Sequence, residues 1–147
     1  MPMIDIYAAS GTFPFPQKLA QAAANLVKTV EKVPDIPMFR KNTAAFIHTL
    51  PPEAIANADG DSDYVRIQVL TNAGALDRDK QIAIVEGLTR LVADAANNPD
   101  LAKKTWVLLT EAAPGGWGLL SHAHTNEELV SAARAEIARL SNEGGRA

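Results

Sequence analysis

The feature that most constrains the fold of this chain is an internal duplication. A strand, a helix and a second strand are predicted within residues 1–60, and the same order of elements follows within residues 61–120. Gly11 and Gly74 end the first strand of each half and match with a slip of one residue. A shift of about 62 residues superimposes four further pairs: Leu26 on Leu88, Val30 on Val92, Pro37 on Pro99, and Pro52 on Pro114.

Hydrophobic periodicity predicts the elements of the first half. Alternating apolar residues predict a strand over residues 3–7. Apolar residues at three- and four-residue steps predict an amphipathic helix over residues 17–33, which Pro34 and Pro37 end. Residues 42–51 are predicted to form the second strand, and a polar connection follows it.

The second half repeats this order, and one more helix follows it. Strands are predicted over residues 64–74 and 105–112, with Asp77 as the cap of the helix between them. The apolar face of that helix is predicted to contain Ile82, Val85, Leu88, Leu91, Val92 and Ala95. A terminal helix is predicted over residues 126–140, with Thr125 or Asn126 as its cap and an apolar stripe of Leu129, Ala133, Ile137 and Leu140.

These elements predict an α+β fold. A helical crossover leaves the two strands of each unit parallel, so we expect a four-stranded sheet with two helices on one face and an additional C-terminal helix. We expect residues 1–147 to form a single domain, divided into units at 1–60 and 61–120 and a C-terminal segment at 121–147.

Composition excludes several classes of function. A net charge of −3 is unfavourable for binding to the phosphate backbone of a nucleic acid, so we expect no nucleic-acid partner. The absence of Cys excludes disulfides, thiolate nucleophiles and Cys-based zinc sites. The chain shows neither a leader pattern nor an apolar run long enough to span a bilayer, so we expect a cytoplasmic protein without a membrane partner.

Pro2 is the first candidate for chemistry. Removal of Met1 turns its nitrogen from a tertiary amide into a secondary amine. An ordinary α-amino group has a pKa of about 7.7 to 8.0, which burial or nearby cations lower. Such an amine transfers protons between carbon and oxygen near neutral pH, whereas a retained Met1 leaves Pro2 without basicity.

Pro2 and the segment at residues 106–118 together resemble the tautomerase superfamily, typified by 4-oxalocrotonate tautomerase. Its β-α-β unit begins with a catalytic proline and ends in a "TE...G-aromatic-G" segment, which Thr110, Glu111, Gly116, Trp117 and Gly118 match. The duplicated length is similar to the fused members, including the cis-3-chloroacrylic acid dehalogenase group. The resemblance implies a fold of the type found in tautomerases and macrophage migration inhibitory factor, a homotrimer, and catalysis by Pro2 without a cofactor.

The chain departs from the family at its arginine positions. Those positions hold Thr12 and Ala75 after the first strand of each half, Asn72 after the third strand, and Ala44 or Ala45 and Trp106 near the second strands. The acid that activates water in the dehalogenases falls on Gly116, so we do not expect water addition to a haloacrylate. We retain Asn72 and Trp106 as candidate substrate-binding residues.

Four more residues are candidates for substrate binding, each with a structural alternative. Arg40 and Arg78 lie near strand ends and have the charge to bind a carboxylate, although solvated loop residues look the same in sequence. His48 has the chemistry to polarise a carbonyl or to be a hydrogen-bonded structural histidine. Trp117, between two glycines, is suited to cover an apolar pocket or to pack at an interface. We place Arg66 on the outer sheet face or at an interface.

We expect no metal site. His122 and His124 share a face if their segment is extended, but no third ligand is evident. The run "ADGDSD" lacks the spacing of a calcium-binding loop and is interpreted as a solvated linker.

Three hypotheses of function remain. The first is a tautomerase that isomerises a small α-keto or enol carboxylate with Pro2 as acid and base. Because the family arginines are missing, a monoacid or aryl enol suits it better than a dianion. The second is a catalytically inactive trimeric ligand-binding protein. The third is a decarboxylase or hydratase that uses the same proline, although no supporting acid is evident in the sequence.

Overall fold

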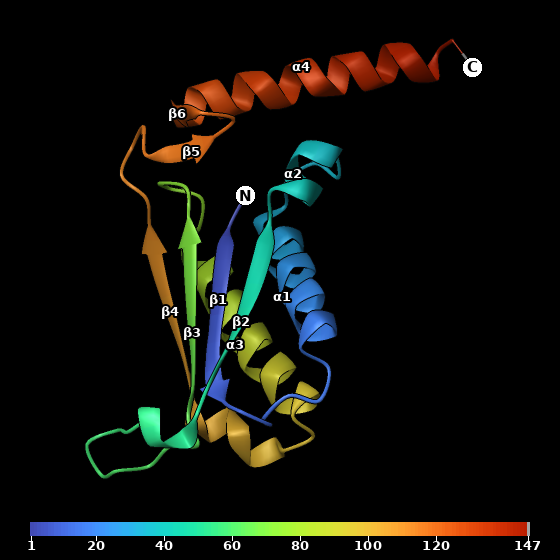
Figure 1. Ribbon diagram of the computed structural model, residues 1–147. Helices are drawn as coiled ribbons and strands as arrows, with labels where there is room; N and C mark the ends of the chain where they lie inside the picture. The colour runs from blue at the N-terminus through green and yellow to red at the C-terminus, as the bar shows by residue number, and fades with distance from the viewer. Residues whose placement is uncertain (147) are drawn as a thin grey trace.

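The computed structural model describes residues 1–146 and consists of a four-stranded sheet with two long helices against one face (Figure 1). The predicted α+β class and the predicted sheet are confirmed. The elements in chain order are β1 (Met3–Ala9), α1 (Pro16–Glu31), α2 (Pro37–Lys41), β2 (Ala44–Leu50), η1 (Pro52–Ala54), β3 (Val65–Thr71), α3 (Arg78–Ala95), η2 (Pro99–Lys104), β4 (Thr105–Glu111), β5 (Trp117–Leu119), β6 (His122–His124) and α4 (Asn126–Gly144).

The topology of the sheet reflects the duplication. The strand order is β2-β1-β3-β4, with β1 parallel to β2, β3 parallel to β4, and the central pair β1 and β3 antiparallel. Met3 pairs with Ala44 in the first half, and Val65 pairs with Thr105 in the second. Because the central pair is antiparallel, the start of β1 lies at the end of the sheet where β3 and β4 finish.

The core lies between the sheet and helices α1 and α3. Its centre consists of fully buried residues of the two central strands, Ile4, Ile6, Ile67 and Val69. The helix residues that complete it follow four-residue steps, with Leu19, Ala23 and Val27 on α1 and Ile84, Leu88 and Val92 on α3. This spacing is the one expected for a single face of a helix.

The apolar face predicted for α3 is wrong at two positions. Ile82 and Val85 are 49% and 37% exposed, whereas Ile84, which was not predicted to be inside, is fully buried. The row 84–88–92 faces the sheet, and Ile82 and Val85 point away from it. The helix has apolar residues on both sides, so periodicity alone did not select the buried one.

Several boundaries also differ from the prediction. Helix α1 ends at Glu31 instead of residue 33, because Lys32 adopts the left-handed conformation with φ of 60°. Pro37 was expected to stop a helix and instead occupies the first position of the short helix α2. The hairpin of β5 and β6 was not predicted because its three-residue strands are too short to show a period.

Helix α4 leaves the body of the protein as an arm (Figure 1). The Thr125 hydroxyl accepts the backbone N–H of Glu128, and the Glu128 carboxylate accepts the N–H of Thr125, which is a capping box. Leu129 and Ala133 are buried near the body, whereas Ile137 is 39% exposed. Only the first part of the predicted apolar stripe is therefore covered within one chain.

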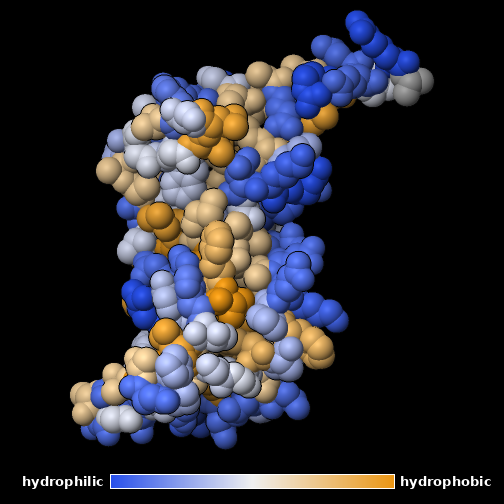
Figure 2. Space-filling model, in the orientation of Figure 1, coloured by the Kyte–Doolittle hydropathy of each residue, from blue (hydrophilic) through white to orange (hydrophobic). Residues whose placement is uncertain are grey.

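The face of the sheet opposite the helices is open. In Figure 2 this face is turned toward the viewer, and it contains apolar side chains among polar ones. Phe46, Trp106 and Leu108 are 52%, 44% and 44% exposed. Arg66 is exposed on this face, as predicted, and its guanidinium donates to the side chain of Gln68.

The burial pattern of α3 predicts which apolar side chains stabilise the fold. We expect Leu88→Ala to lower the free energy of unfolding by about 2 to 5 kcal/mol, because it removes a fully buried side chain and leaves a cavity. The matched control Ile82→Ala should change it by about 0.5 kcal/mol or less. Urea denaturation at one protein concentration measures both, and equal losses would contradict the observed orientation of α3.

The capping box makes the start of α4 sensitive to pH. The N–H of Thr125 and, secondarily, the ring of His122 lower the pKa of Glu128 below its ordinary value of 4.5. The folded state thus favours the carboxylate, and this contribution is present above pH 4.5 and lost as pH falls through the depressed pKa.

We expect Glu128→Ala to speed the hydrogen exchange of the first turn of α4 at neutral pH. In the wild type, acid should destabilise this turn further, and the variant should lack this effect of acid. Hydrogen exchange of the first-turn amides measures both effects. Glu127→Ala, which removes a neighbouring exposed glutamate, is the control. If the two variants behaved alike, the capping box would not account for the stability of this turn.

Candidate active site

The N-terminus of the chain is buried at the end of the sheet where β3 and β4 finish. Met1 is 2% exposed, and Pro2 is among the fully buried side chains. The carbonyl of Pro2 accepts the N–H of Ala44 at 3.3 Å, which continues the β1–β2 pairing beyond the first residue of β1. The position of Pro2 is thus determined by the sheet.

The terminal amine contacts a carboxylate that comes from α1. The Met1 nitrogen lies 3.3 Å from Oε1 of Glu31, and the two side chains are 1% and 7% exposed. Among the described residues, no group donates a hydrogen bond to the other oxygen, Oε2. Burial lowers the pKa of the amine below its ordinary value of 8.0, and the charge and hydrogen bond of Glu31 partly oppose this effect.

A pocket of about 540 Å³ opens beside Met1 and Glu31. Phe39 from α2 and Asn72 from the loop after β3 contribute to its wall. Helix α4 contributes Leu129 and several neighbouring side chains. The lining is mostly apolar, and such a lining suits a small ligand whose polar groups are recognised at a few points. Its residues are Met1, Glu31, Lys32, Val33, Pro34, Phe39, Asn72, Ala73, Gly74, Ala75, Asn126, Leu129, Val130, Ala133, Arg134 and Ile137.

Three cationic side chains surround this pocket. Lys32 and Arg134 are among its lining residues. The Nζ atom of Lys80, on α3, donates to the backbone carbonyl of Glu31 at 3.1 Å. Positive charge is therefore available at the pocket, although it does not come from the arginines that the sequence suggested.

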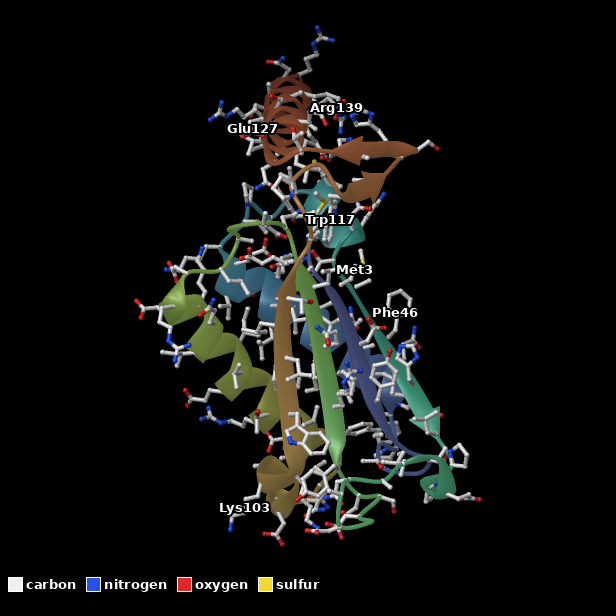
Figure 3. The ribbon with its side chains drawn as sticks, turned by 90° about the vertical axis from the view of Figure 1, so that its left-hand side faces the viewer. Met3, Phe46, Lys103, Trp117, Glu127 and Arg139 are labelled. Carbon is white, nitrogen blue, oxygen red and sulfur yellow. The ribbon has the colours of Figure 1, made fainter. Side chains whose placement is uncertain are left out.

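Trp117 lies at the same end of the sheet. It is 7% exposed and belongs to an apolar cluster with Met1 and Leu129, against which Met3 packs. Figure 3 shows Trp117 and Met3 together at this end, with Phe46 further along the sheet and Lys103 at the opposite end. The turn before the tryptophan requires Gly116, because a Cβ there would lie 2.9 Å from the Ala113 carbonyl oxygen. This backbone leaves no room at residue 116 for the acid of the dehalogenases.

The structure brings three of the sequence-predicted site residues together. Pro2 is fully buried next to Met1 in the chain, Asn72 lines the pocket together with Met1, and Trp117 belongs to the apolar cluster that contains Met1. They come from the residue before β1, the loop after β3 and the segment after β4, and all three segments reach one end of the sheet.

The other four predicted site residues neither line this pocket nor belong to the apolar cluster around Met1. Arg40 donates to the Asp35 carbonyl at 2.8 Å, and Arg78 lines a groove on the outer side of α3. The other two are on the open sheet face. There, Trp106 stacks on Tyr64 with ring centroids 4.6 Å apart, and His48 is hydrogen-bonded to Asp5 at 2.7 Å.

Sequence reasoning missed Glu31, Lys32, Lys80 and Arg134. A signal for Glu31 was present, since it continues the buried row of Leu19, Ala23 and Val27 at the next four-residue step. A carboxylate in such a row is a candidate for a buried ionic contact. The three cations had no comparable signal, because charged residues on helix surfaces are common.

Two structural absences concern the described residues, 1–146. No group of three or more His, Asp or Glu side chains is arranged to hold a metal ion in this range. His122, a possible ligand in the sequence, is hydrogen-bonded to Glu128 at 2.9 Å. No helix within these residues has the length and apolarity needed to cross a membrane.

Comparison with known proteins identifies the fold. No protein-family model and no curated protein sequence matches the chain. Among solved structures, a fused 4-OT wild-type symmetric trimer is similar, with a TM-score of 0.71, 14% identity, and coverage of 86% of this chain and 98% of that one.

Two further structures share this similarity. Pt0534 inactivated by 2-oxo-3-pentynoate has a TM-score of 0.71 and 16% identity, over 86% of this chain and 98% of that one. A member of the cis-3-chloroacrylic acid dehalogenase family has a TM-score of 0.63 and 16% identity, over 87% and 88%. At these identities the similarity shows the fold, so the predicted resemblance to fused tautomerase-superfamily proteins is confirmed at that level.

Proposed function

We propose that this chain, which has the fold of fused 4-OT proteins, is a cofactor-free tautomerase in which Pro2 transfers protons after removal of Met1. The observation that carries the proposal is the placement of Pro2. It is fully buried at the end of the sheet and is bonded to Met1, which lines a pocket of about 540 Å³. Loss of Met1 gives the new amine access to this pocket.

The reaction that suits this geometry is the interconversion of an enol and an α-keto acid. The amine exchanges one proton with the hydroxyl oxygen of the enol and one with the neighbouring carbon, so the nitrogen is unchanged at the end of the cycle. In the unprocessed chain, burial lowers the pKa of the Met1 amine at this end of the sheet, and the charge and hydrogen bond of Glu31 oppose that shift.

The pocket favours a substrate that has one carboxylate and an apolar body. Phe39, Leu129 and the other apolar lining residues suit an aryl or alkyl group. Lys32 and Arg134 have the charge to bind the carboxylate and to stabilise the enolate that forms during proton transfer. We therefore propose a monoacid or aryl enol, such as phenylenolpyruvate, as the substrate class.

The proposed assembly is a homotrimer formed through the open face of the sheet. Phe46, Trp106 and Leu108 expose apolar surface there, and such patches mark interfaces between proteins. A similar solved structure is a symmetric trimer. In a trimer, side chains that lie outside the pocket of their own chain, such as Trp106 and Arg40, can approach the pocket of a neighbour.

One observation favours a different function. In the unprocessed chain, Met1 fills space beside the pocket and its amine is ion-paired with Glu31. If the cell retains Met1, the protein is a non-catalytic ligand-binding member of this fold. The intact mass of the expressed protein decides between the two functions, because loss of one methionine is required for catalysis.

Substitution of Pro2 tests the catalytic proposal. We expect Pro2→Ala to lower the rate of phenylenolpyruvate ketonisation by about 10²-fold or more, the usual contribution of a general acid or base. Pro14→Ala, in the exposed loop before α1, is the matched control and should retain the full rate. Intact mass must show that Met1 is absent from all three proteins, and equal rates in them would remove Pro2 from the mechanism.

A charge on the open face tests the proposed assembly. We expect Leu108→Lys to convert the trimer into single chains of 15.7 kDa, because it places a charge in the apolar contact. Val85→Lys introduces the same charge on the outer side of α3 and should leave the trimer intact. Light scattering during size-exclusion chromatography measures both masses. A wild-type monomer, or a trimer that tolerates Leu108→Lys, would contradict the proposal.

A further inference from the structure

We propose that Glu31 is a positioning residue that holds a proton on the Pro2 amine of the mature chain. Under this proposal, the first step of the reaction is the transfer of a proton from the Pro2 ammonium to a carbon atom of the enol carboxylate. The inference rests on the proposed function, to which it adds a second residue and an order of proton transfers.

The burial of Glu31 calls for such a role. Its side chain is 7% exposed, and a buried carboxylate is costly unless it is paired. It also occupies the last position of α1, where the helix dipole disfavours negative charge. An apolar residue at this position would continue the row of Ala23 and Val27 without either cost. Stability of α1 therefore does not explain the carboxylate, whereas an amine partner does.

The chain geometry keeps the Glu31 carboxylate and the Pro2 nitrogen near each other. Glu31 Oε1 lies 3.3 Å from the nitrogen of Met1, and the nitrogen of Pro2 is three bonds further along the chain. From standard bond lengths, the Pro2 nitrogen is within about 7 Å of this oxygen. When Met1 is removed, Glu31 loses its present partner, and the Pro2 amine becomes the cationic group that replaces it.

Glu31 is the acidic partner available to the amine, because the other charged side chains of the pocket are cations. Among the described residues that line the pocket, Glu31 is the one acid. The cations of this region are Lys32 and Arg134, which line the same pocket, and Lys80 from α3, which donates to the Glu31 backbone carbonyl. In the unprocessed chain, burial lowers the pKa of the terminal amine more than Glu31 raises it. Removal of Met1 admits water beside the nitrogen and weakens that burial effect, while the charge of Glu31 remains.

The protonated amine determines the order of the reaction. The ammonium of Pro2 gives its proton to the substrate carbon, forming a C–H bond and leaving the electron pair of the N–H bond on nitrogen. The hydroxyl proton of the resulting oxygen-protonated ketone then moves to the same nitrogen. The products are the keto acid and the original ammonium, so protons and charge balance without a co-reactant.

The test measures the basicity of Pro2 separately from turnover. In protein whose intact mass shows Pro2 at the N-terminus, the rate of covalent labelling by 2-oxo-3-pentynoate is followed against pH by mass spectrometry. This compound inactivates Pt0534, a protein of the same fold. The neutral amine is the form that adds to the triple bond, so the pH midpoint of labelling reports the pKa of the amine.

We expect Glu31→Gln to lower this midpoint by about one pKa unit or more, because it removes an opposite charge near the amine. Glu31→Asp keeps the charge and should retain most of the wild-type midpoint. Glu53→Gln, an exposed residue at the opposite end of the sheet, should not change it. Far-ultraviolet circular dichroism verifies that each variant is folded.

The outcomes separate this inference from the proposed function. Equal midpoints in the wild type and Glu31→Gln would overturn the role of Glu31, even if ketonisation proceeds. A lowered midpoint in protein that does not ketonise any enol would support the role of Glu31 and overturn the tautomerase proposal. Equal midpoints in Glu31→Gln and Glu31→Asp would show that packing, not charge, is responsible and would also overturn the inference.

Discussion

The antiparallel pairing of β1 with β3 is the constraint on which the rest of the structure depends. Ile4 and Ile6 pair with Val69 and Ile67 at the centre of the sheet, and all four are fully buried against the two helices. This pairing joins the two halves into one core. It also places the N-terminus at the end of the sheet where β3 and β4 finish, so the segments that follow these strands can surround it.

The two ends of the sheet differ in what occupies equivalent positions of the two halves. The shift that superimposes the two halves places Tyr64 at the position of Pro2. In the second half the chain is continuous there, and no amine can exist. Tyr64 instead stacks on Trp106 at this opposite end. A duplication therefore produces two similar frameworks but one site with an N-terminal amine.

The environment of that amine combines desolvation with charge. Burial disfavours the ammonium, and the buried carboxylate of Glu31 favours it, so the two effects oppose each other at one atom. The covering of the site comes from outside the duplicated units, since Trp117 and Leu129 belong to the last part of the chain. The side chain of Asn126 donates to the Ala73 carbonyl at 2.7 Å and fastens the start of α4 to the loop after β3. The C-terminal segment thus forms one wall of the site at this end of the sheet.

Local pattern in the sequence determined the three long helices, the cap at Asp77 and the choice of Thr125 or Asn126 as the last cap, because each depends on residues close together in the chain. The repeated order of elements then indicated the parallel strand pairs. Local pattern did not determine which side of α3 is buried, since both sides have apolar residues. Nor did it show that Glu31 would meet the N-terminus, although its place in the buried row of α1 was visible. That contact joins residues thirty positions apart. It exists only because the tertiary structure brings the end of α1 and the start of β1 to one end of the sheet.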